Sequence, residues 1–374
     1  MVGFTCPFCY NVYEKRAIRY VCPDCNTEST PGKEPIKCQN PGCGGLATDR
    51  ICPSCLNKIP RVALQTPNLS ISMVGVSTSG KTNYITVMIE ELMNFSGLRL
   101  AMGAQTNETR DHQNANRENI YIKCIPADAT PFGVTTPQIW YIKNLAKKRS
   151  GFFGGNTVPT YTFSVYDGAG ENYANMEAVA VRYVRSSDAF IITLDPLILE
   201  GVRAFVDSEV IKNSYKAEAY SEYINSTAIV EALVNHLKDI KGIPVDKPLE
   251  IPVAVVLTKF DTVSSHPSFM NSRAKKPSLS VNSGKVRVEE FDEVHNEIEA
   301  WLQSIKEQKF INTMDANFAT YDRKGNLKKR HYKFFAVSSY GESPTEEGTT
   351  ARKIRPHRVL DPMLWLFKKK NFID

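Results

Sequence analysis

Long apolar runs are missing from this chain of 374 residues. No stretch of 18 or more apolar residues occurs, so the sequence predicts no transmembrane segment. Residues 1–6 contain neither the apolar stretch of a signal peptide nor the glycine at position two that myristoylation requires. We therefore expect a cytoplasmic protein. Its 42% hydrophobic and 23% charged residues are typical of a globular fold.

Cysteine is nearly absent after residue 55, where Cys124 alone remains and is expected to be buried as a small apolar residue. Paired cysteines in a cytosolic chain favour thiolate metal ligands over disulfides. Because tetrahedral zinc takes four thiolates, the other eight cysteines predict two structural zinc sites. They form four pairs, which are Cys6 and Cys9, Cys22 and Cys25, Cys38 and Cys43, and Cys52 and Cys55.

Residues 1–62 are rich in proline and glycine and show no helical apolar period, which predicts a module of tandem zinc ribbons. Two ribbons in series would take their ligands from Cys6–Cys25 and Cys38–Cys55. A cross-braced module would instead join the first pair with the third and the second with the fourth. Neither half has enough apolar area to fold unaided, so zinc must supply folding energy. With four thiolates on each zinc no open position remains for catalysis, which favours recognition or a structural cap.

From residue 63 onwards, strand-like apolar runs alternate with helical stretches. This pattern predicts an α/β domain over residues 63–374, with a mostly parallel sheet covered on both faces. Strands are expected at residues 69–74, 138–145, 161–166, 189–194, 253–257 and 332–337, and helices at residues 84–95, 228–240, 288–306 and 363–369, the last with Asp361 as N-cap. Insertions are expected near residues 97–134 (a mobile loop), 196–250 (extra helices) and 262–287 (a surface loop).

A turn bracketed by glycines lies between the first predicted strand and the first predicted helix. It has the pattern GxxxxGKT, whose backbone N–H groups and following helix N-terminus hold phosphates. Lys81 would reach the β- and γ-phosphates, and the Thr82 hydroxyl would ligate magnesium. The predicted phosphate-binding residues are Gly75, Ser77, Thr78, Ser79, Gly80, Lys81 and Thr82. This motif alone does not separate ATP from GTP.

Two further segments follow predicted strands. In Asp167-Gly168-Ala169-Gly170, the aspartate can hold magnesium through water and the Gly170 N–H can sense a γ-phosphate. In Thr258-Lys259-Phe260-Asp261, the aspartate can accept hydrogen bonds from guanine N1 and N2, which adenine cannot supply. The Lys259 stem can cover the purine ring. Ser338, with Ser339 beside it, follows the last strand, where a backbone N–H can meet guanine O6.

Together these motifs resemble those of P-loop GTPases of the translation-factor and Ras-related class, over about residues 68–374. The resemblance implies a six-stranded sheet, a site for GTP or GDP with magnesium, and two switch segments around the γ-phosphate. The switch threonine, a magnesium ligand, would be Thr136 or Thr135, with Thr130 as a third option. With its zinc head, the chain also resembles the double-GTPase families of bacterial conflict systems, which act beside a second GTPase or an activator-like protein.

The chain departs from that class at several positions, among them Ser77 and Thr78, which replace small glycines common in the Ras branch. Thr258 stands where most members have asparagine, and Glu171 stands where many have a glutamine that orients water. A carboxylate beside the γ-phosphate favours slow hydrolysis stimulated by a protein partner. The residues expected to act in hydrolysis are Lys81, Thr136, Gly170 and Glu171.

Two other readings remain open from the sequence: a nucleotide-gated protein that binds RNA or the ribosome, and a scaffold that binds GTP without hydrolysing it. Basic runs occur at residues 147–149, 323–331 and 368–370. A solvated surface is the default for each run. Two of them converging with the zinc head would make nucleic acid a credible partner.

Overall fold

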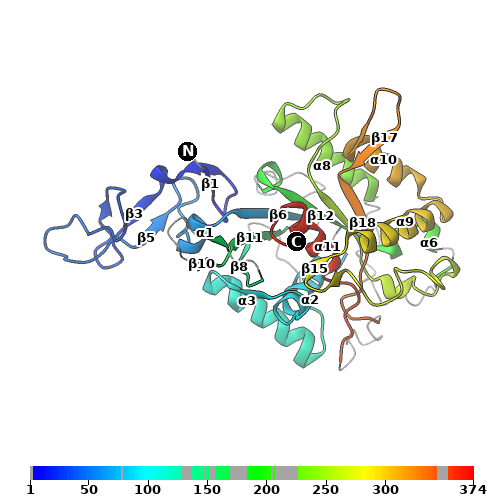
Figure 1. Cartoon of the computed structure of the whole chain (residues 1–374), viewed down its shortest axis with the longest axis horizontal. Helices are drawn as coiled ribbons and strands as arrows, with labels where there is room; N and C mark the ends of the chain where they lie inside the picture. Colours follow the sequence, from blue (N-terminus) through cyan, green and yellow to red (C-terminus); the bar gives the residue numbers. More distant parts are fainter. Residues whose placement is uncertain are drawn as a thin grey trace.

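The computed structural model describes residues 3–76, 79–128, 137–146, 149–150, 156–168, 183–203, 205–206, 226–342 and 353–374. A cysteine-rich head, drawn in blue, extends from one side of a larger α/β body (Figure 1). Among the helices of these residues, none is both long and apolar enough to cross a membrane.

A seven-stranded sheet forms the centre of the body, in the order β18-β13-β12-β6-β11-β8-β7. The strands are β6 (Asn68–Val74), β7 (Leu100–Ala104), β8 (Gln138–Asn144), β11 (Thr160–Asp167), β12 (Ala189–Leu194), β13 (Val253–Leu257) and β18 (Tyr332–Ala336). Within this sheet β8 alone runs against the other strands, because it pairs in antiparallel fashion with β11 on one side and with the edge strand β7 on the other. The predicted mostly parallel sheet is confirmed. The expected six strands are all present, and β7 is a seventh.

Helices cover both faces of this sheet (Figure 1). They are α2 (Lys81–Met93), α3 (Asn107–Glu118), α8 (Ser226–Lys241), α9 (Val288–Ser304), α10 (Gln308–Phe318) and α11 (Asp361–Lys369). Side chains alternate between two cores along the central strands. In β13, Val255 packs into the core with α8, α9 and α10, whereas Val256 packs into the core with α2 and α11. Both faces are therefore apolar, as a doubly covered parallel sheet requires.

The prediction of a mobile loop at residues 97–134 is wrong for the described residues of this range, which contain β7 and α3. The polar composition suggested a loop, but polar side chains here are buried through hydrogen bonds. The Thr106 hydroxyl caps α3 by accepting the N–H of Thr109 at 3.1 Å. Gln113 donates to the Thr86 carbonyl on α2 at 3.0 Å. Cys124, expected to be buried, is partly exposed at the end of the π-turn at Asn119–Lys123.

Extra helices occur in the second insertion as expected, with η3 (Pro196–Ile198), α6 (Glu200–Arg203) and α8. The surface loop expected at 262–287 is instead a partly buried segment that contains η6 (Pro267–Phe269), β14 (Val281–Asn282) and β15 (Lys285–Val286). Arg358, which is fully buried, donates to the carbonyls of Arg273 and Lys276 in this segment.

Asp361 does not cap α11, because the N-cap position is Leu360. Its carboxylate instead pairs with Arg358 at 2.7 Å, and Glu290 on α9 pairs with the same guanidinium at 2.8 Å. This buried ion network joins α9 to α11 through Arg358, which lies between the two helices in the chain.

The head consists of short strands and turns. β1 (Gly3–Thr5) pairs with β2 (Val12–Glu14), and β3 (Arg19–Val21) pairs with both β4 (Glu28–Ser29) and β5 (Asp49–Ile51). The helix α1 (Arg61–Gln65) then leads into β6. A basic hairpin of β16 (Ala319–Tyr321) and β17 (Leu327–Arg330) precedes the last strand.

Candidate functional site

The loop that follows β6 lies at the centre of the sheet. The strands β11 and β12, which follow each other in the chain, flank β6 on opposite sides. Ligands of open α/β sheets bind at the carboxyl edge beside such a reversal of strand order. The first residue of the loop, Gly75, tolerates no side chain: an added Cβ would lie 1.9 Å from Thr193 Oγ1. Gly80 adopts φ +80° immediately before α2.

Side chains of this loop fold back onto its own backbone. The Ser79 hydroxyl donates to the Val76 carbonyl at 2.8 Å and lies 2.7 Å from Thr193 Oγ1. The Lys81 ammonium is buried and donates to the carbonyls of Gly75 and Val76 at 3.1 and 2.9 Å. These bonds tie Ser79 and Lys81 to the backbone of Gly75 and Val76.

Thr82 and Asp167 meet at the same edge of the sheet. Thr82 lies in the first turn of α2, and Asp167 is the last residue of β11, in register with Met73 of β6. The Thr82 hydroxyl donates to Asp167 Oδ2 at 2.7 Å. A hydroxyl and a carboxylate oxygen are ligands that magnesium prefers. Two of the three residues predicted to bind magnesium are therefore neighbours, and the third, Thr136, lies outside the described residues.

The segments after β13 and β18 also lie side by side, because these two strands are parallel neighbours. The Ser338 hydroxyl donates to Asp261 Oδ1 at 2.5 Å. The N–H of Phe260 donates to the Val337 carbonyl at 3.0 Å. These bonds fix the position of the Asp261 carboxylate. The N–H of Ser338, which we expected to face a ligand, instead donates to the His357 carbonyl at 3.1 Å.

Lys259 has a partner that the motif did not predict. Its backbone is left-handed, with φ +50°, and its ammonium lies 2.6 Å from Asp195 Oδ2. Asp195 is fully buried and follows β12 directly, where its other oxygen accepts the N–H of Leu197 at 3.0 Å. An aspartate immediately after a buried strand, at the edge that carries the other motifs, was the signal in the sequence.

Seven predicted site residues lie outside the described part of the chain. They are Ser77 and Thr78 in the loop after β6, Thr130, Thr135 and Thr136 before β8, and Gly170 and Glu171 after β11.

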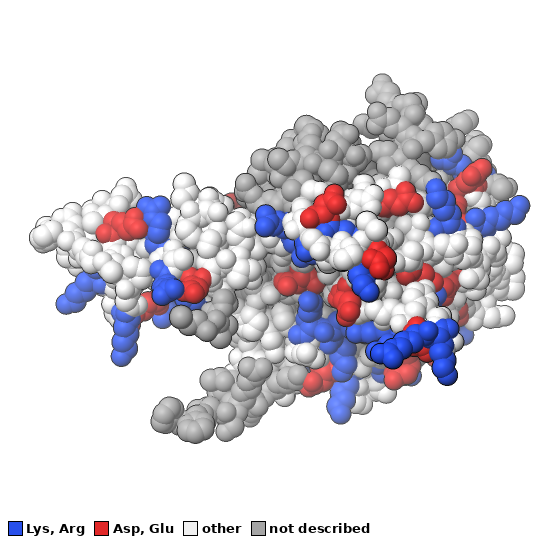
Figure 2. Space-filling model, turned by 90° about the horizontal axis from the view of Figure 1, so that it is seen from above, with Lys and Arg blue, Asp and Glu red and all other residues white. Residues whose placement is uncertain are grey.

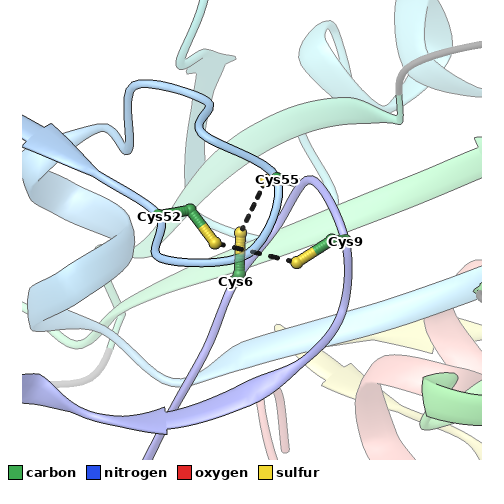
Figure 3. A group of neighbouring side chains, drawn as sticks. All are labelled: Cys6, Cys9, Cys52 and Cys55. Atoms are coloured by element: carbon green, nitrogen blue, oxygen red, sulfur yellow. Dashed lines mark hydrogen bonds between the residues drawn. The ribbon is translucent and has the colours of Figure 1, made fainter. Parts of the chain in front are cut away.

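Eight cysteines form two clusters of four, within each of which the sulfur atoms lie within 4.8 Å of one another. Figure 3 shows the first cluster, which we call the proximal cluster, made of Cys6, Cys9, Cys52 and Cys55. The second, the distal cluster, contains Cys22, Cys25, Cys38 and Cys43.

Sulfur distances test whether these clusters fit zinc. In the proximal cluster the sulfur atoms lie 3.9 Å apart for Cys6–Cys55 and 3.8 Å apart for Cys9–Cys52. In the distal cluster the distances are 3.7 Å for Cys22–Cys43 and 3.4 Å for Cys25–Cys38. Tetrahedral zinc with bonds of about 2.3 Å places its sulfur ligands about 3.8 Å apart, whereas a disulfide requires about 2.05 Å. Both clusters therefore fit zinc.

The pairing of the four cysteine pairs is nested. The first pair joins the fourth, and the second joins the third, so both arrangements considered from the sequence, serial ribbons and cross-bracing, are wrong. The cause is the pairing of β3 with β5, which brings residues 19–21 beside residues 49–51. This pairing places the first and last cysteine pairs side by side.

On the face shown in Figure 2, acidic side chains lie between the basic ones on both head and body. The described residues of that face therefore present no continuous positive surface to a nucleic acid.

No family model matches the sequence, and no curated protein matches it. Among solved structures, the chain is similar to the small GTPase Arl6 (BBS3) of Trypanosoma brucei with bound GppNp, at 12% identity over 82% of this chain and 99% of that chain, with a TM-score of 0.30. It is also similar to the SRb-GTP/SRX signal recognition particle receptor of Chaetomium thermophilum (13%, 75% and 94%, TM-score 0.29).

A third match is the GTPase-like domain of Ski7 from S. cerevisiae bound to GTP, at 11% identity over 82% of this chain, with a TM-score of 0.33. The chain spans 50% of that Ski7 chain. Scores this low carry no argument about function, which must rest on the site itself. The chain is thus an α/β protein with a mostly parallel sheet and two four-cysteine clusters, and these similar structures are described as GTPases, GTPase-like or GTP-bound.

Proposed function

We propose that the protein is a GTP-binding switch that hydrolyses GTP slowly and is stimulated by a protein partner. One observation carries this proposal: the phosphate-type loop, the Thr82–Asp167 pair and the Asp261–Ser338 pair all lie at the carboxyl edge of the sheet. Parallel strands bring their carboxyl ends to one edge, so phosphate, magnesium and base can be bound by a single row of loops.

At the phosphate end, the loop from Gly75 to Thr82 would surround the β- and γ-phosphates. Lys81 would exchange the loop carbonyls for phosphate oxygens, which bind an ammonium more strongly because they are charged. Thr82 would ligate magnesium directly and Asp167 through water. When bound, the ion neutralises phosphate charge.

At the base end, the Asp261 carboxylate would accept hydrogen bonds from guanine N1 and N2, held in place by Ser338. The Lys259 stem would cover the purine ring, anchored by Asp195. Because the Ser338 N–H is already bonded, we assign guanine O6 to the N–H of Ser339, the next residue in the loop.

Thr136, Gly170 and Glu171 keep the roles expected from the sequence, in the switch segments and in hydrolysis. The zinc head would recognise a protein partner, either an activator or a second GTPase, since four thiolates per site leave no open metal position.

The base site is tested by titrating zinc-loaded protein with labelled GTP in magnesium. GTP and GDP should compete and ATP should not. In Asp261→Asn, the amide offers one acceptor and one donor, which match the N1–H and O2 of xanthine, so preference should move from GTP to xanthosine triphosphate. Equal competition by ATP, or unchanged GTP preference in Asp261→Asn, would show that the base site is misassigned.

Hydrolysis needs a separate measurement, single turnover of bound GTP with and without candidate partners. Slow release of phosphate that a partner accelerates supports the switch. Tight GTP binding with no turnover under either condition would leave a non-hydrolysing scaffold.

A further inference from the structure

Each cysteine pair of the head is followed by a residue in the left-handed backbone conformation. These residues are Tyr10, Asn26, Gly44 and Leu56, with φ between +56° and +63°. The N–H of Tyr10 donates to the Cys6 carbonyl at 2.8 Å, and Leu56 makes the same bond to Cys52 at 3.1 Å. The turn around the metal ligands therefore sets the direction of the side chain at this position.

Tyr10 and Leu56 occupy this position in the two turns of the proximal cluster, but their surroundings differ completely. Leu56 is 62% exposed, whereas Tyr10 is fully buried and belongs to the same core as Val74 and Tyr166 of the α/β body. One residue of a metal-binding turn is thus a core residue of the neighbouring domain.

The sheet provides a slot for this ring. Ser70 and Ser72 of β6 and Ser164 of β11 are fully buried and alternate with the apolar residues of the opposite core. Small side chains on this face leave room for an aromatic ring. The Tyr10 hydroxyl lies 3.3 Å from the Ile71 carbonyl and 3.2 Å from the Ser164 carbonyl, and so bridges the two parallel strands.

From Tyr10, two further rings lead to the end of β11. The rings of Tyr10 and Tyr183 meet edge to face with centroids 5.2 Å apart, and Tyr183 stacks on Tyr166 at 3.8 Å. Tyr166 directly precedes Asp167, which contacts Thr82. Three packed tyrosines therefore connect the proximal cluster to the carboxylate assigned to magnesium.

We propose that Tyr10 is a positioning residue for the nucleotide site, so that zinc in the proximal cluster and magnesium–GTP at the sheet edge stabilise each other. Zinc would hold the turn that inserts Tyr10, and Tyr10 would hold Tyr183 and Tyr166 against the strand that ends at Asp167. Because binding linkage is reciprocal, each ligand must raise the affinity of the other by the same factor. This inference rests on the proposed function.

The first test compares Tyr10→Asn with Leu56→Asn, a matched change at the equivalent position of the same cluster. Asparagine suits the left-handed conformation at both positions. With two zinc ions per chain verified, Tyr10→Asn should bind magnesium–GTP about tenfold more weakly and Leu56→Asn within about twofold of wild type. Without added magnesium, the Tyr10→Asn loss should vanish, since Asp167 acts through the ion. Tyr10→Phe, which keeps the ring, should lie between.

The second test measures linkage in the native Tyr10 background. Cys25→Ser removes a distal ligand, so that zinc occupancy reports the proximal cluster during titration with a zinc buffer. A magnesium–GTP analogue should lower the free zinc needed for half occupancy about tenfold. This measurement decides the matter if Tyr10→Asn fails to fold.

Zinc curves that superimpose with and without nucleotide would overturn the proposal, as would wild-type magnesium–GTP affinity in folded Tyr10→Asn. A loss in Tyr10→Asn that is independent of magnesium would also overturn it, because it would indicate a structural role alone. If wild-type protein binds no guanine nucleotide, the proposed function fails first and this inference falls with it.

Discussion

Replacing Asp195 by asparagine isolates the contribution of the buried carboxylate beneath the base site. The amide has the same size and keeps an oxygen that can accept the Leu197 N–H, but it loses the charge 2.6 Å from the Lys259 ammonium. A hydrogen bond to a charged group contributes about 1.5–3 kcal/mol. Lys259 retains 24% side-chain exposure, so solvent screening reduces its share.

The expected loss of nucleotide affinity comes from freeing the lysine stem. In Asp195→Asn the stem must be immobilised when the purine binds, which costs about 0.5–1.5 kcal/mol for a flexible side chain. The Lys259 ammonium is also held less firmly without the charge of Asp195. Together the two effects should reduce the binding free energy by about 1–2 kcal/mol, which raises Kd roughly 5- to 30-fold. GTP and GDP should lose equally, because both share the base contact.

A fluorescence titration with labelled GTP and GDP measures this loss. Asp188→Asn is the matched control, because Asp188 lies at the opposite end of β12, where it accepts the Ser70 N–H and hydroxyl at 2.9 and 2.8 Å. Asp188→Asn should leave the affinities for GTP and GDP unchanged. Wild-type affinity in Asp195→Asn, or a loss confined to GTP, would refute the reasoning.

Three further predictions concern the body of the protein. Gly75→Ala should weaken GTP binding roughly 5- to 160-fold, because its Cβ meets Thr193 Oγ1 at 1.9 Å and overpacking costs about 1–3 kcal/mol. Adding Thr193→Ala should restore part of the affinity, and a wild-type Kd in Gly75→Ala alone would contradict the clash. Arg358→Met removes the cation that pairs with the buried Asp361 carboxylate and leaves Glu290 with Arg273 alone, so it should cost about 3–5 kcal/mol in chemical denaturation, whereas Arg19→Met, in an exposed pair, should leave the denaturation midpoint close to that of the wild type. Burial, with nearby cations, lowers the pKa of His295 to about 3; the unfolded chain therefore binds the extra proton below pH 6.5, so stability should fall by about 2 kcal/mol from pH 7 to pH 5, and His295→Gln should flatten that slope.

The regular strands were predictable because the central sheet is covered on both faces and its strands are continuous apolar runs. The strands β12 and β13 begin and end at the residues that the sequence predicts. The strand β7 and the helix α3 were missed. The buried polar residues of α3 are satisfied by tertiary hydrogen bonds, such as that from Gln113 to the Thr86 carbonyl on α2, which no local pattern reveals.

Motifs located the candidate site, but its supporting residues depend on which strands are neighbours. Asp261 and Ser338 were both recognisable, whereas the bond between them requires β13 to pair with β18. The partner of Lys259 was likewise hidden, because Asp195 is 64 residues away in the chain. Cysteine spacing predicted two metal sites yet not their nested pairing, which follows from the contact of β3 with β5.

Because of that nested arrangement, the segment between Val21 and Asp49, which carries the distal cluster, forms a separate tip of the head. The chain leaves the proximal cluster along β3 and returns along β5, with Val21 opposite Asp49, so everything between them is closed by a paired ladder and by its own metal. Loops that start and end at adjacent residues tolerate replacement, since the entropy cost of closing a loop depends only weakly on its length. We expect the tip to be exchangeable for a short turn without loss of the proximal zinc. Such a layout lets the distal cluster diverge in evolution while the part of the head that touches the α/β body stays constant.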